Sequence, residues 1–144
     1  MKFHRCNAFS ILCISFIFPL GAIAADGLKT ATTQYVVAYL TLQQLRSGEC
    51  GKTLGARPQD QSAILKTIEL AKPFMTPKEL VQLRSGELQQ EMIKSVEPIV
   101  TKVLAEARNI GKGNREVCLF AIGYSAGRMQ EARDMLKFSG GPAL

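Results

Sequence analysis

Apolar residues recur every three or four positions along most of the chain, which is the spacing of one face of an α-helix. The first such segment runs from Leu28 to Arg46. Its apolar positions are Leu28, Ala31, Tyr35, Ala38, Leu42 and Leu45. Gly48 and Gly51 flank Cys50 and are expected to end this helix, because glycine readily adopts the left-handed conformation of a helix C-cap. We predict one amphipathic helix, followed by a loop over residues 51–58.

Two further helix starts are marked by capping residues. Asp60 is the expected N-cap of a short helix that runs to about Lys72 and is ended by Pro73. Its inward-facing residues are Ile64, Ile68 and Ala71. Thr76, Pro77 and Glu79 have the spacing of a capping box with proline at the first helical position.

A long apolar stripe follows Thr76, and two residues interrupt it. The stripe consists of Leu80, Leu83, Leu88, Met92, Val96, Ile99, Val103, Ala107 and Ile110. Gly86 and Pro98 lie within it, and Pro98 should kink or split the helix because it lacks a backbone donor. Residues 111–114 form the next turn. Asn114 is the expected cap of a last helix from Arg115 to about Phe138, and residues 139–144 are expected to form a flexible tail.

The predicted fold is therefore an all-α, single-domain bundle of four or five helices over residues 25–138, with no convincing strand. The segment "LQQLRSGE" (42–49) returns as "LVQLRSGE" (80–87). The similarity does not extend beyond these eight positions, whereas a solenoid repeat would keep its pattern through a full period. Two leucines followed by Arg, Ser and Gly are typical of a helix approaching its C-terminus. We interpret the repeat as two similar helix endings; an old duplication or a shared docking surface is the alternative.

The N-terminus has the composition of a secretory signal peptide over residues 1–24. Lys2 and Arg5 precede an apolar run, and Ala22-Ile23-Ala24 fits the small-x-small cleavage pattern. The run is too short for a membrane anchor. The sequence thus predicts a periplasmic or secreted protein of 144 less 24, or 120, residues without stable membrane insertion.

Export changes how the cysteines are interpreted. Of four cysteines, Cys6 and Cys13 lie in the signal peptide, which leaves Cys50 and Cys118 in a compartment that permits oxidation. We predict that they form a disulfide. A redox pair would normally show two cysteines two residues apart, and a metal site needs more ligands.

Charge and residue types exclude several functions. Removing Lys2 and Arg5 lowers the formal charge from +6 to +4, and the remaining cations are spread rather than clustered, so no nucleic-acid partner is expected. His4 is the only histidine and leaves with the signal peptide. A histidine-dependent nucleophile or zinc site is thereby excluded, and neither a metal nor a cofactor is expected.

The last predicted helix contains the segment "CLFAIGYSAGRMQEA" (118–132). Gly123 and Gly127 are four residues apart and share one helix face, so they would let another backbone approach closely. Glycine within a helix usually has a packing reason, and we expect that reason to be packing inside the monomer. A partner or a kink is the alternative.

The same segment resembles two families over a few residues each. "IGYSAG" followed by Glu131 and Ala132 resembles the Gly-Tyr-x-x-Gly helix of small secreted immunity proteins of the Rap/Tai type. This resemblance implies a helical inhibitor of cell-wall amidase toxins. "SAGRMQ" (125–130) is similar to a Gly-Leu-Met-Gln segment of lytic transglycosylases, which implies peptidoglycan cleavage with Glu116 as acid/base; a solvated glutamate is the alternative.

We predict an exported binding protein rather than an enzyme, with another protein as its partner. Among binding functions we favour an inhibitor or immunity protein, whose partner would include a cell-wall-targeting toxin. The second alternative is a periplasmic chaperone or secretion-system accessory protein, and the least favoured function is a peptidoglycan-cleaving enzyme. Tyrosine and arginine are enriched at binding hot spots, so the candidate contact residues lie in the loop after Cys50 and on the last helix. They are Lys52, Arg57, Tyr124 and Arg128. Tyr124 has apolar neighbours and is also a candidate core residue.

Overall fold

The computed structural model describes residues 24–55 and 59–144, so the predicted signal peptide up to residue 23 and Arg57 lie outside the described residues. Within them the fold is all-α, as predicted, and no strand is present. The helices are α1 (Ala24–Ser47), α2 (Glu49–Leu54), α3 (Gln61–Glu69), the 3-10 helix η1 (Lys72–Phe74), α4 (Pro77–Ser85), α5 (Glu87–Ser95), α6 (Glu97–Arg108) and α7 (Asn114–Phe138). The described residues thus form more helical segments than the four or five expected.

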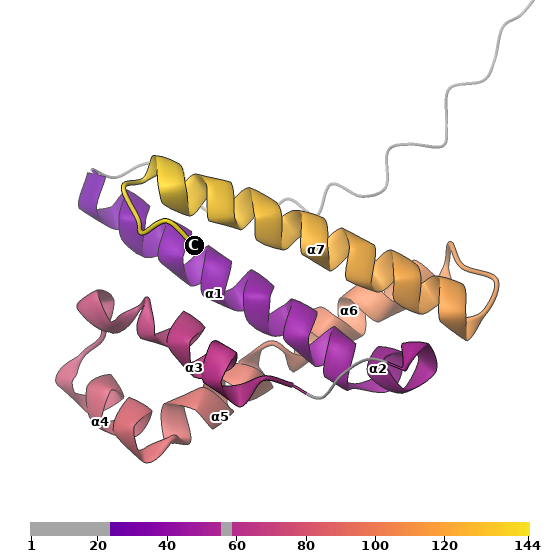
Figure 1. The fold of residues 1–144 in the computed structure, drawn as a ribbon, viewed down its shortest axis with the longest axis horizontal. Coiled ribbons are helices and arrows are strands. Elements are labelled where there is room, and N and C mark those ends of the chain that lie inside the picture. The colour runs from indigo at the N-terminus through magenta and orange to yellow at the C-terminus, as the bar shows by residue number, and fades with distance from the viewer. Residues whose placement is uncertain (1–23, 56–58) are drawn as a thin grey trace, which may run out of the picture.

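The two long helices, α1 and α7, lie side by side and antiparallel, and they form the axis of the molecule (Figure 1). Helix α6 packs against both of them near the start of α7. The shorter helices α3, α4 and α5 lie on the other side of α1 from α7 (Figure 1). Helix α1 is therefore covered from two sides.

Three groups of buried side chains make up the core, and α1 contributes to each. The first joins α1 to α3, α4 and α5 through Val36, Leu40, Ile64, Ile68, Leu83, Leu88 and Val96. The second joins α1 to α6 and α7 through Leu45, Val103, Ala107, Val117 and Ala121. The third joins α1 to the end of α7 through Ala31, Tyr35, Ala132 and Leu136. Val36 and Leu40, which the predicted stripe omitted, are fully buried because they face α3 and α5.

The end of the first helix differs from the prediction in one respect. Helix α1 ends at Ser47, before Gly48, as expected. Gly51, however, does not begin a loop, because it lies inside α2 and is buried. The left-handed cap is instead Gly55, with φ of 66°. The predicted loop over 51–58 is therefore helical as far as Leu54.

Helix α3 begins as predicted and ends earlier. The Asp60 carboxylate accepts a hydrogen bond of 3.1 Å from the Ala63 backbone N–H, which confirms the N-cap. Ile64 and Ile68 are buried. The α-helix ends at Glu69 rather than near Lys72, and the chain tightens into η1 instead of stopping at Pro73.

The capping box at the start of α4 is confirmed. Thr76 Oγ1 accepts a hydrogen bond of 3.3 Å from the Glu79 N–H. The Glu79 carboxylate in turn accepts hydrogen bonds from the Thr76 hydroxyl (2.6 Å) and the Thr76 N–H (2.7 Å). These two bonds favour the ionised form, and they hold the pKa of Glu79 below its ordinary value of 4.5.

Acidification is expected to weaken this cap. A folded-state pKa below the unfolded one stabilises the protein above pH 4.5, and that contribution is lost as the pH falls through the folded pKa. The urea midpoint of Glu79→Gln should therefore fall less than that of the unchanged protein between about pH 6 and about pH 3. If the urea midpoint falls by the same amount in the two proteins, the Glu79 cap is not the cause of this pH dependence.

The apolar stripe after Thr76 is divided into three helices at the two predicted interruptions. Gly86 has φ of 81° and separates α4 from α5, and Val96 separates α5 from α6 two residues before Pro98. Most members of the stripe are buried or half-buried. Ile110 is the exception, with 54% of its surface exposed, because α6 ends at Arg108.

Helix α7 starts one residue earlier than expected, and the Asn114 cap was a wrong prediction. Asn114 is the first helical residue, and Gly113 occupies the N-cap position without a side-chain hydrogen bond. The Glu116 carboxylate accepts a hydrogen bond of 2.8 Å from the Lys112 N–H and so holds the preceding turn against the helix.

The repeated segment, at residues 42–49 and 80–87, does mark two helix endings. Each copy ends an α-helix at its serine, Ser47 or Ser85, and the glutamate after the glycine begins the next helix. The glycines between them differ, because Gly86 is left-handed whereas Gly48 has φ of −81°. The same eight-residue pattern thus supports two different bends.

The C-terminal end of α7 closes with a Schellman motif. Gly140 has φ of 82°, and the N–H groups of Gly140 and Gly141 donate to the carbonyls of Lys137 and Leu136. The remaining residues turn back toward α1 (Figure 1). Flexibility of residues 139–144 stays a prediction.

Candidate functional site

A groove of about 450 Å³ lies between α1, α6 and α7 and is partly open to solvent. Its apolar lining includes Val37 and Ala38 from α1, Ile99 and Val103 from α6, and Ala132 and Met135 from α7. Each of these helices buries other side chains in the core, so the walls stand on packed elements. The volume is within the usual range for ligand sites in proteins.

Charged side chains line the groove as well. Lys102 comes from α6, and Arg128 and Glu131 come from α7. Arg128 Nη1 lies 2.6 Å from Glu131 Oε2, in an exposed i,i+3 pair. Lys102 forms no ion pair with the described residues. The lining therefore carries one more positive than negative charge.

Tyr124 is both a packing residue and a groove residue. Its ring packs against the core group formed by α1, α6 and α7, yet it remains half-exposed and lines the groove. Partial burial raises the pKa of Tyr124 above its ordinary value of 10.0, against the opposing effect of the nearby Arg128 guanidinium. The phenol therefore stays protonated at neutral pH and is able to donate a hydrogen bond.

Ser125 places a buried hydroxyl in the groove lining. The residue is only 3% exposed, and its Oγ has no hydrogen-bond partner among the described residues. The buried threonine hydroxyls of the described chain behave differently. Thr32, Thr41 and Thr67 each donate to the carbonyl four residues earlier, at 2.8 to 2.9 Å. Ser125 is thus a polar group without the partner that burial normally requires.

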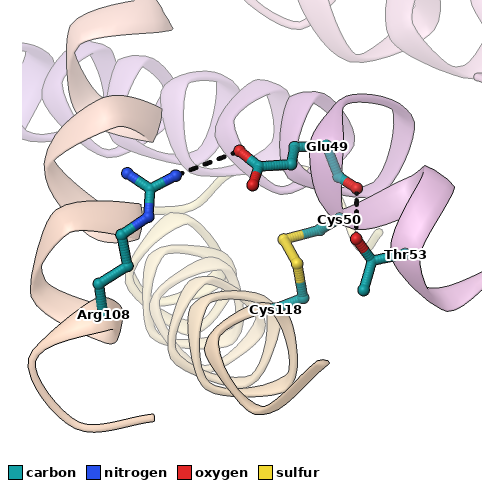
Figure 2. The surroundings of a disulfide bond; sticks show 5 residues. All are labelled: Glu49, Cys50, Thr53, Arg108 and Cys118. Carbon is teal, nitrogen blue, oxygen red and sulfur yellow. Dashed lines mark hydrogen bonds and ion pairs between the residues drawn. A yellow bond between two sulfur atoms is a disulfide. The ribbon is translucent and has the colours of Figure 1, made fainter. Parts of the chain in front are cut away.

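The predicted disulfide joins Cys50 of α2 to Cys118 in the first turns of α7, with the two Cα atoms 5.1 Å apart (Figure 2). Both cysteines are buried. Beside them, Arg108 of α6 forms an ion pair of 3.2 Å with Glu49, and the Thr53 hydroxyl donates to the Glu49 carbonyl (Figure 2). This corner connects α2, α6 and α7 at one end of the groove's helices.

The structure brings together two of the four predicted contact residues. Tyr124 and Arg128 are four residues apart on α7 and both line the groove. Lys52 is exposed on α2 and is not part of the groove. Arg57 lies outside the described residues.

The expected packing of Gly123 and Gly127 inside the monomer was a wrong prediction. Both are exposed, and a Cβ atom built at either position would meet no other atom within 4 Å. Helix α7 turns this face to solvent because its opposite face, with Cys118, Ala121 and Ser125, is the buried one.

Glu116, the candidate acid/base, is exposed and bonded to the Lys112 backbone, so its position matches the alternative of a solvated glutamate at a helix start. Within residues 26–55 and 59–144, no three His, Cys, Asp or Glu side chains gather closely enough to hold a metal ion. None of the helices in the described part of the chain combines the length and apolar character needed to cross a membrane.

Sequence reasoning missed Ser125 and Lys102 as site residues. A signal for Ser125 was present, because it lies in helical register with Cys118, Ala121 and Ala132, which indicates a buried face. Lys102 gave no such signal, since its place in the groove depends on how α6 packs. The chain matches no protein-family model, no curated protein and no solved structure. The function proposed below therefore depends on the chemistry of the groove.

Proposed function

We propose that this protein is an exported binding protein that inhibits or neutralises a partner protein. The observation that carries the proposal is the groove between α1, α6 and α7, where Tyr124 and Arg128 lie together on an apolar surface with charged side chains around it. An apolar centre with a polar rim, enriched in Tyr and Arg, is the usual composition of a protein-binding surface.

The rigidity of the scaffold supports the same proposal. The disulfide links α2 to α7, and the Schellman motif closes the other end of α7. Side chains that are held in place before binding lose less conformational entropy when the partner arrives. Export, for which the N-terminal sequence is the support, would place this surface in the periplasm or outside the cell. The resemblance of "IGYSAG" to secreted immunity proteins makes a cell-wall-targeting toxin the first partner to test.

Replacing Tyr124 or Arg128 by alanine is expected to weaken partner binding by more than about tenfold, which corresponds to roughly 1.4 kcal/mol. Each change removes a large contact area and a hydrogen-bonding group from the groove. The partner would be isolated by affinity purification from the protein's own source, and its dissociation constant would be measured by calorimetry for each variant.

Arg115→Ala is the matched control, because Arg115 is an exposed arginine of α7 outside the groove. Its affinity should stay within about twofold of the unchanged protein. If Tyr124→Ala and Arg128→Ala both bind the partner as tightly as the unchanged protein does, the contact surface lies outside the groove. Release of soluble fragments from peptidoglycan by the purified protein, abolished by Glu116→Gln, would contradict a binding function altogether.

A further inference from the structure

The unpartnered Ser125 hydroxyl indicates what the groove binds. It is a buried donor in a mostly apolar lining, and the three buried threonine hydroxyls of the described chain are all satisfied within their own helix. A buried hydroxyl without a partner gains from an acceptor that reaches it, because leaving a buried hydrogen-bond donor unpaired costs free energy. A purely apolar occupant would leave this donor unsatisfied.

We propose that the groove binds an amphipathic helix of the partner protein, which presents large aliphatic side chains and one Asp or Glu carboxylate on the same face. The aliphatic side chains lie against Val37, Ile99 and Met135. The carboxylate accepts the hydrogen bond from Ser125. This inference rests on the protein-binding function proposed above and names the kind of segment that is bound.

The shape of the groove favours a helix over a small molecule. The stretch of α7 that lines it, from Tyr124 to Met135, is about 16 Å long at ~1.5 Å per residue. A helix places side chains at i and i+7 about 10 Å apart, so two or three anchors fit along this length. Small ligands usually bury about 70–90% of their surface, whereas this groove is partly open to solvent. A bound amphipathic helix needs such an opening, because its polar face stays in solvent.

The charges around the groove favour an acidic segment over a basic one. Lys102 has no ion-pair partner among the described residues, and Arg128 shares one of its five N–H donors with Glu131. Arg128 follows Ser125 by three residues, so the two side chains are neighbours on α7. A carboxylate that accepts from Ser125 is therefore close to the Arg128 guanidinium, whereas a lysine in its place would be close to a like charge.

The test is a selection from a displayed library of helix-forming peptides of about 16 residues, with the purified, oxidised protein as bait. The expected result is enrichment of peptides with aliphatic residues at i, i+3 or i+4, and i+7, together with one acidic residue on that face. The best enriched peptide is then synthesised, and its dissociation constant is measured by fluorescence anisotropy.

Three variants make the test specific to the groove. Ser125→Ala should weaken binding of the acidic peptide by about tenfold. It should not lower the melting temperature of the protein, since it removes a donor that the folded protein leaves unsatisfied. Lys102→Glu should weaken binding of the peptide by a similar factor. Lys94→Glu, the same charge change at an exposed position on α5 outside the groove, should change the affinity by less than about twofold.

Three outcomes would overturn the inference. The first is enrichment of peptides without an acidic residue. The second is an equal affinity of Ser125→Ala and the unchanged protein for the enriched peptide. The third is that the NMR signals of Ser125 and Val103 shift when dodecanoate is added but not when the enriched peptide is added. The last would identify the groove as a site for a small amphiphile. If the affinity of a natural partner depends on Tyr124 but not on Ser125 or Lys102, the proposed binding function is kept. The proposal that the groove binds an acidic helix is then rejected.

Discussion

Reduction of the Cys50–Cys118 disulfide is expected to lower the free energy of unfolding by about 4 kcal/mol, and the melting temperature by about 15 °C. The two cysteines are separated by 68 positions, so the bond closes a long loop in the unfolded chain. Opening that loop returns conformational entropy to the unfolded state and favours unfolding.

The measurement is thermal unfolding by circular dichroism with and without a thiol reductant. The control is the double variant Cys50→Ser and Cys118→Ser, which should melt near the temperature of the reduced protein and should not respond to reductant. Two free thiols, found by alkylation and mass spectrometry in protein taken from its native compartment, would contradict the predicted bond.

The disulfide also bears on the groove, because Cys118 and the groove residues from Tyr124 to Met135 belong to the same helix. Arg108 of α6 pairs with Glu49 next to the bond, although this pair is exposed and contributes little by itself. The covalent link is therefore the main constraint on how α7 meets α2 at this end of the bundle.

The second large effect is a difference between two leucines with nearly identical local sequences. Leu42→Ala is expected to cost about 3 kcal/mol of stability, whereas Leu80→Ala should cost about 1 kcal/mol. The two residues begin the two copies of the repeat, so the seven residues that follow them match at all but one position. Leu42 is 1% exposed between packed helices, whereas Leu80 is half-buried on α4. The larger cavity is left at Leu42.

Urea unfolding of both variants measures this difference directly. The controls are Arg46→Ala and Arg84→Ala, which are exposed arginines at equivalent places in the two copies and should each change stability by less than about 0.5 kcal/mol. Equal losses at Leu42 and Leu80 would mean that the two helix endings are packed alike, contrary to the structure.

The candidate site was predictable in part. Tyr124 and Arg128 were predicted from residue type and from their place on the last helix, and both line the groove. Lys52 was named because it follows Cys50, yet it lies outside the groove. The groove itself was not predictable, because its walls come from α1, α6 and α7, and no local pattern states which faces of three helices meet.

The sequence by itself determined the helices and several of their ends. The Thr76–Glu79 capping box, the Asp60 cap and the break near Pro98 each depend on residues within four positions of one another, and each is present in the structure. The pairing of Cys50 with Cys118 followed from their being the two cysteines outside the predicted signal peptide. Local hydrogen bonding and simple counting were sufficient for these features.

Only the tertiary structure decided which helix faces are covered. The sequence pattern assigned α1 one apolar face, but α1 is packed from two sides, which buries Val36 and Leu40. Gly123 and Gly127 were expected to be covered and are exposed. Ser125, a small polar residue on the same helix, is buried without a partner. The physical reason is that burial depends on contacts between residues far apart in the chain, whereas periodicity reports only how one helix is divided into faces.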